Sequence, residues 1–112
     1  KALAIGPQIQ STFKKAYAKG VKIAFGSDAG VFPHGNNAKE FRYMNEVGMP
    51  VMECLQSATV TNASILGYAE ELGQISPGFI ADIVATNDDP TDNISTLENV
   101  IFVMKNGIVY KD

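Results

Sequence analysis

Two side chains in the stretch GSDAGVFPHG, residues 26–35, are the best candidates for chemistry in this sequence. Asp28 is a carboxylate flanked by small residues, which leave room for a ligand, and His34 is the only histidine among the 112 residues. A carboxylate in such a loop can ligate a metal, accept a proton from a bound water or hold a substrate amine. An acid and an imidazole in one loop therefore indicate a site, without identifying its reaction.

Each of these residues also has a purely structural interpretation. Aspartate is common in turns because its carboxylate bonds nearby backbone N–H groups, and a loop histidine can simply pack or face solvent. A hydrolytic metal site needs three or four protein ligands, largely histidine and carboxylate. With one histidine and no paired ligand spacing such as H-x-H, the sequence does not contain a complete metal site.

A helix and a buried strand are predicted to position this loop. Residues 7–19 place apolar side chains at helical spacing, with Pro7 in the first turn and Gly20 as the C-cap. Residues 21–25, VKIAF, are short and β-rich, as expected of a strand covered on both faces. This succession favours an α/β unit, in which the loop at the carboxyl end of a strand lies where ligands bind.

Three further helices are predicted after the loop. The first spans residues 36–47, the second begins at Pro50, and the third has Thr61 as its N-cap and stops at Gly67. Cys54, the single cysteine, falls on the apolar face of the second helix. We interpret it as a buried small hydrophobic residue, and no internal disulfide is possible.

The rest of the chain is β-rich. Residues 80–85 form a β-like run, and two later runs are joined by Asn106 and Gly107, a pair that favours a type I′ hairpin turn. The chain is therefore predicted to divide into an α/β part, residues 1–67, and a β-rich part, residues 68–112.

Composition restricts the partners of the chain. Its net charge is −3 and its lysines and arginines are scattered, so it has no basic field for nucleic acid or for an anionic membrane surface. No apolar run approaches the roughly twenty residues that a membrane span needs. The first residues lack a signal-peptide pattern. Because the sequence starts at Lys1 without an initiator methionine, we expect a segment of a longer protein, whose localisation is left open.

Four segments, in this order, resemble the metal-dependent amidohydrolase superfamily, and within it the imidazolonepropionase-like and Xaa-Pro dipeptidase-like subgroup. They are VKIAFGSDAGVFPHG with the helix after it, ATVTNASILG, LGQISPGFIADIVATNDDP and VIFVMKNGIVYKD. The resemblance runs from about residue 5 to the end of the chain. It implies a C-terminal fragment, with the last helix-strand-helix units of a TIM-like (β/α)8 barrel in residues 1–67 and part of a small β-sandwich in residues 68–112.

The resemblance also implies roles for the loop residues. The family's active site lies in the barrel mouth and holds one or two divalent metals, often zinc, bound by histidines on strands that this chain lacks. Asp28 matches the aspartate that closes the eighth strand, so we expect it to ligate the metal and to shuttle a proton to the leaving nitrogen. His34 is expected beside the mouth, in contact with a substrate carboxylate or carbonyl. The substrate expected for the full-length protein is an amide, a dipeptide or a cyclic amide.

The isolated chain is expected to bind no metal and to be inactive, because the other ligand strands are missing. A barrel strand without neighbours exposes its edges, so we also expect the chain to form a homo-oligomer. The alternative is a non-catalytic small α/β module with a binding or structural role, in which Asp28 is a turn residue.

Overall fold

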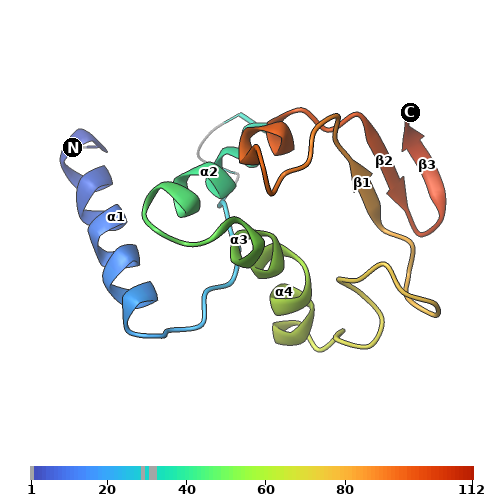
Figure 1. Ribbon diagram of the computed structural model, residues 1–112, viewed down its shortest axis with the longest axis horizontal. Helices are drawn as coiled ribbons and strands as arrows, with labels where there is room; N and C mark the ends of the chain where they lie inside the picture. The colour runs from blue at the N-terminus through green and yellow to red at the C-terminus, as the bar shows by residue number, and fades with distance from the viewer. Residues whose placement is uncertain (1, 29, 31–32) are drawn as a thin grey trace.

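The computed structural model describes residues 2–28, 30 and 33–112, with side chains from residue 6 onward. Helix α1 lies at one end of the molecule and a small sheet at the other, with α3 and α4 between them (Figure 1). No helix in these ranges is both long enough and apolar enough to cross a membrane. The elements are α1 (Ala2–Ala18), α2 (Lys39–Glu46), α3 (Val51–Ala58), α4 (Val60–Ile65), β1 (Ile83–Ala85), the 3-10 helix η1 (Ile94–Glu98), β2 (Phe102–Lys105) and β3 (Ile108–Lys111).

The helix predicted for residues 7–19 is confirmed, but it begins earlier than expected. Helix α1 contains Pro7 in its interior. Proline removes one backbone N–H donor, and this close to the helix N-terminus the loss affects a single turn. The predicted C-cap is confirmed, because Gly20 has φ +78° and its N–H donates to the Tyr17 carbonyl at 3.0 Å.

The strand predicted for residues 21–25 is wrong for this chain. Residues 21–28 form no strand, and the sheet of the described residues consists of the three C-terminal strands. A strand needs a neighbour for its backbone groups, and the described part of the chain supplies none here. The barrel units expected from the resemblance are therefore not formed within these residues, whereas the mixed α/β character is confirmed.

The three helices predicted after the loop are confirmed, with shifted starts. Helix α2 starts three residues into the predicted range 36–47, and α3 starts directly after Pro50. The N-cap predicted at Thr61 is wrong, because the chain departs from helical geometry at Thr59 and α4 begins directly after it. The Thr59 hydroxyl donates to the Leu55 carbonyl at 2.8 Å, so this side chain bonds back onto α3 instead of capping α4.

A small apolar core forms where α1, α2 and α3 meet. Met44, Met49 and Cys54 are its buried side chains. Cys54 is fully buried, which confirms its predicted place, and this burial raises the pKa of its thiol to about 11. The side chains that pack against this core are those of Phe13, Tyr17, Ile23, Phe25, Phe41 and Ile94.

The hairpin predicted near the C-terminus is confirmed. Strands β2 and β3 pair antiparallel, and Asn106 and Gly107 have φ of +49° and +78°, as a type I′ turn requires. The carboxylate of Asp82 accepts from the Asn106 N–H at 2.8 Å and from the Lys105 ammonium at 3.2 Å. These two bonds lower the pKa of Asp82 and fasten the turn to the chain just before β1.

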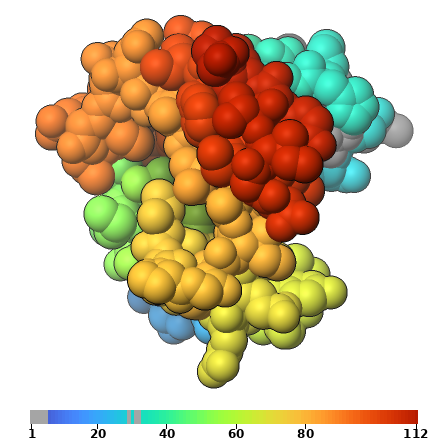
Figure 2. All heavy atoms as spheres, turned by 90° about the vertical axis from the view of Figure 1, so that its right-hand side faces the viewer, coloured from blue at the N-terminus to red at the C-terminus, as the bar shows by residue number. Residues whose placement is uncertain are grey.

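Large apolar side chains remain exposed around the sheet. In Figure 2, which views this end of the molecule, the β2–β3 hairpin (red) lies on the surface. Its side chains Ile108 and Tyr110 are exposed, as is Ile75 in the turn region before β1. Such exposure is compatible with association. The expected homo-oligomer and the division at residue 67 both stay predictions.

Candidate functional site

Asp28 stands at the end of the segment 21–28 in an uncommon backbone conformation. Its φ is +46°, and its carbonyl accepts the N–H of Gly30 at 2.7 Å. Aspartate and asparagine adopt such left-handed conformations more readily than other residues with a side chain. The Asp28 side chain is exposed, so its carboxylate is accessible to a ligand.

Three helices hold the segment that leads to Asp28, and all three contact Phe25. The Phe25 N–H donates to the Ser57 carbonyl of α3 at 3.2 Å, and the Phe25 carbonyl accepts from the Asn62 side-chain amide of α4 at 3.0 Å. The Phe25 ring stacks on Phe41 of α2, with ring centroids 4.4 Å apart. The position of Asp28 therefore depends on contacts made three residues earlier.

His34 is also exposed, on the far side of the loop. Residues 29, 31 and 32, between the two candidates, lie outside the described residues. Among the side chains that are described, no hydrogen bond or ion pair joins His34 to Asp28. The structure thus places both predicted residues on one loop without a hydrogen bond or ion pair between them, and the substrate contact expected of His34 stays a prediction.

The donor set of the described residues does not fit a divalent metal ion. No group of three or more histidine, cysteine, aspartate or glutamate side chains comes together in this part of the chain. Catalytic zinc sites use about three protein ligands, and Asp28 is a single carboxylate. Cys54 is buried in the core, and its burial raises the pKa of the thiol, which disfavours the thiolate that a metal would need. Any metal at Asp28 needs ligands from other segments.

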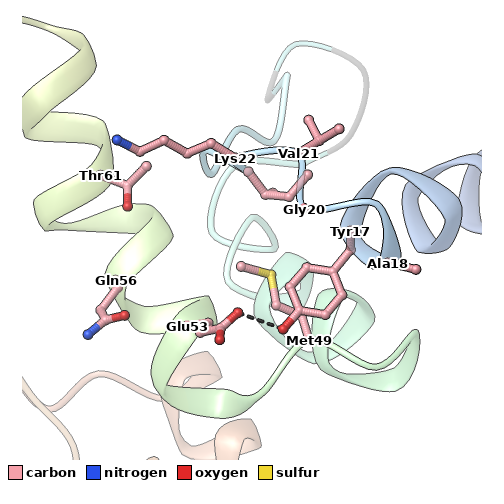
Figure 3. A pocket seen from close by; sticks show the side chains of 10 residues that line it. Tyr17, Ala18, Gly20, Val21, Lys22, Met49, Glu53, Gln56 and Thr61 are labelled. Carbon is pink, nitrogen blue, oxygen red and sulfur yellow. Dashed lines mark hydrogen bonds between the residues drawn. The ribbon is translucent and has the colours of Figure 1, made fainter.

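A hollow of about 550 Å³ lies at the other end of the segment, between α1, α3 and α4. Its wall includes Lys22 and Thr61, and across it the Tyr17 hydroxyl donates to the Glu53 carboxylate at 2.6 Å (Figure 3). That bond raises the pKa of Tyr17. Since Asp28 does not line this hollow, it is separate from the candidate site. No pattern in the sequence indicates it, because its walls come from α1, the segment that follows it, Met49, α3 and α4.

Ser57 and Asn62 are two further residues of the site that no sequence pattern indicated. Both lie in or beside the segment ATVTNASILG, whose helical character was predicted. Their bonds to Phe25 join residues more than thirty positions apart, and no local spacing reveals such a contact.

Known proteins resemble this chain over nearly its whole length. The sequence model of the amidohydrolase family matches residues 5–109. Ochratoxinase from Aspergillus niger is 29% identical over 116 residues, which cover 99% of this chain and 24% of that protein. A crystal structure of a Xaa-Pro dipeptidase with methionine bound in its active site is 53% identical, with a TM-score of 0.95 over 99% of this chain and 27% of that one.

A third relative also matches most of this chain and about a quarter of its own length. The crystal structure of a prolidase in complex with N-methylphosphonate-L-proline is 31% identical, with a TM-score of 0.80 over 91% of this chain and 26% of that one. The chain thus spans about a quarter of the length of these relatives. The family match includes the Asp28 loop, the helices that hold it and most of the C-terminal hairpin, so the resemblance seen in the sequence is confirmed. The chain belongs to the amidohydrolase family.

Proposed function

We propose that this chain is the C-terminal part of a metal-dependent hydrolase that cleaves carbon–nitrogen bonds. The observation that carries the proposal is the 53% identity to a Xaa-Pro dipeptidase, which extends over 99% of this chain at a TM-score of 0.95. Prolidase and ochratoxinase relatives point in the same direction. Among the substrates that the sequence left open, a Xaa-Pro dipeptide is therefore the first to test, ahead of other amides and cyclic amides.

In this proposal Asp28 is both a metal ligand and the group that moves the proton. The metal, zinc in our proposal, would lower the pKa of the attacking water, and other segments of the longer polypeptide would supply its remaining ligands. Asp28 accepts the proton that the water loses as its oxygen adds to the substrate carbonyl. It then delivers this proton to the nitrogen as the carbon–nitrogen bond breaks, so the products are a carboxylic acid and an amine.

The geometry of the described residues supports this role. The Asp28 carboxylate is exposed, and its loop begins where three helices fix Phe25. A side chain that is accessible but carried on an anchored backbone suits proton transfer, which depends on position. We propose in addition that His34, six residues further along the same loop, contacts a carboxylate or carbonyl of the substrate.

The test compares the full-length polypeptide with the 112-residue chain. Both are purified, supplied with zinc, and assayed on a Xaa-Pro dipeptide, an N-acyl amino acid and a cyclic amide. We expect the full-length protein to hydrolyse at least one of them and to lose this activity when a chelator removes the metal. We expect the 112-residue chain alone to give no turnover above its metal-free control, because one carboxylate does not make a site.

Two outcomes contradict the proposal. Metal-dependent turnover by the 112-residue chain would show that the site is complete within it. A folded full-length protein that holds metal but hydrolyses none of the three substrates would favour a non-catalytic binding or structural module.

A further inference from the structure

We propose that Asn62 is a positioning residue for Asp28, acting through the backbone of Phe25. This inference rests on the proposed function, because it assigns Asn62 a part in the hydrolytic step. It concerns an amide in α4 that touches neither substrate nor metal. Its contribution is to hold the segment 21–28 in the one place from which the Asp28 carboxylate can reach the reacting atoms.

The first observation is that both backbone groups of Phe25 are bonded to helices. Its N–H donates to the Ser57 carbonyl at 3.2 Å, and its carbonyl accepts from the Asn62 amide at 3.0 Å. Ser57 is 1% exposed, so the first bond is sheltered from water. A residue held at its N–H and at its C=O cannot rotate either peptide group without losing a bond of about 1 kcal/mol net worth.

The second observation explains why the two bonds reach Phe25 together. The chain departs from helical geometry at Thr59, where φ is −116° and ψ is −93°. The Ser57 carbonyl, near the end of α3, therefore accepts a bond from outside the helix. Directly after the break, α4 presents Asn62 to the same residue. The break between the helices thus brings one acceptor and one donor to Phe25.

The third observation is that Phe25 is the last anchored residue before Asp28. Its ring stacks on Phe41 at 4.4 Å, whereas the two residues that follow it are small, Gly26 and Ser27. Three residues span at most about 10 Å, so a shift at Phe25 is carried to the carboxylate with nothing large between to absorb it. Misplacement of a reacting group by about 1 Å can reduce the rate by about a hundredfold.

Asparagine suits position 62 because its side-chain amide supplies the N–H donor that the Phe25 carbonyl accepts. Replacement of Asn62 by Asp keeps the size of the side chain but points an oxygen at the Phe25 carbonyl, which repels it. Replacement by Ala removes the donor and the contact. The same chemistry occurs once more in the described residues, where the Asn45 amide of α2 donates to the Met49 carbonyl at 3.0 Å. Both asparagines are half-buried, so Asn45 offers a matched control.

The experiment uses the full-length polypeptide with zinc and four variants, Asn62→Ala, Asn62→Asp, Asn45→Ala and Asn45→Asp. Four quantities are measured for each: kcat and KM on the best substrate, the melting temperature, and the hydrogen exchange of the Phe25 amide, whose N–H donates to the Ser57 carbonyl. We expect the Asn62 variants to lose about tenfold to a hundredfold in kcat while KM changes by less than about threefold. We expect exchange at the Phe25 amide to become faster in the Asn62 variants alone.

The Asn45 variants separate positioning from general stability. If they lose as much kcat as the Asn62 variants at the same drop in melting temperature, Asn62 is merely structural and the proposal is wrong. The proposal is also wrong if Asn62→Ala and Asn62→Asp leave the exchange of the Phe25 amide unchanged. Hydrogen exchange needs no turnover, so it tests the anchoring of the segment even in an inactive protein. If the wild-type protein hydrolyses none of the substrates but exchange is faster in the Asn62 variants, the anchoring of Phe25 is confirmed. The catalytic role of Asn62 and the proposed function are then both wrong.

Discussion

Replacement of Asp28 by Asn in the full-length polypeptide is expected to lower kcat for carbon–nitrogen hydrolysis by roughly 10²–10⁴-fold, the usual contribution of a positioned acid–base group. Asparagine has the same size and accepts the same left-handed backbone, which at Asp28 has φ +46°. Because the side chain is exposed, no packing is lost. The variant therefore removes the charge and the proton acceptor and leaves the fold alone, and steady-state kinetics beside a melting curve measure both effects.

The matched control is Asp92→Asn. Asp92 is an exposed aspartate of the C-terminal part, and this change removes the same charge from a residue outside the loop. We expect it to retain full activity. If Asp28→Asn keeps wild-type kcat, Asp28 is a turn residue, and if its activity falls only in step with its melting temperature, its role is structural.

Replacement of Gly73 by Ala is expected to produce the largest loss of stability among single changes in the turn region. A Cβ at Gly73 would lie 2.8 Å from the Thr59 carbonyl oxygen and 3.1 Å from the Ala63 Cβ, and these are backbone and core atoms that cannot move aside. Its φ of +95° is also unfavourable for alanine. Overpacking costs about 1–3 kcal/mol, and the left-handed backbone adds about 1 kcal/mol. We expect a total loss of about 2–4 kcal/mol in the free energy of unfolding, measured by denaturant titration.

Gly78→Ala is the control that divides this loss into its two parts. Gly78 has φ +89°, close to that of Gly73, but a Cβ there meets nothing within 4 Å. We therefore expect Gly78→Ala to show only the backbone cost, about 1 kcal/mol. Equal losses in the two variants would contradict the close approach of Gly73 to Thr59.

The features that could be predicted from the sequence are those that local residues decide. Asn106 and Gly107 specify the hairpin turn, because few other pairs accept two left-handed residues in succession. The apolar stripe of α1 and its Gly20 cap are equally local, and Cys54 falls on the buried face of α3. Each of these was predicted and is present in the structure.

The features that could not be predicted depend on distant partners. The β-rich run at residues 21–25 forms no strand, because pairing requires a neighbour that the described chain lacks. Thr61 is suited to cap a helix by its residue type, but the break falls at Thr59, where Gly73 packs closely from the following turn. The candidate site divides in the same way. The loop and Asp28 could be found from the sequence, whereas the anchoring of Phe25 could not.

The position of Asp28 relative to a bound metal is the most direct test of the proposed function. A crystal structure of the full-length polypeptide, grown with zinc, locates the ion by its anomalous scattering. The proposed function predicts a carboxylate oxygen of Asp28 at about 2.0–2.2 Å from the ion, with the other ligands supplied by segments outside this chain. An ion bound in a complete site elsewhere, with the Asp28 carboxylate directed into solvent, would contradict it.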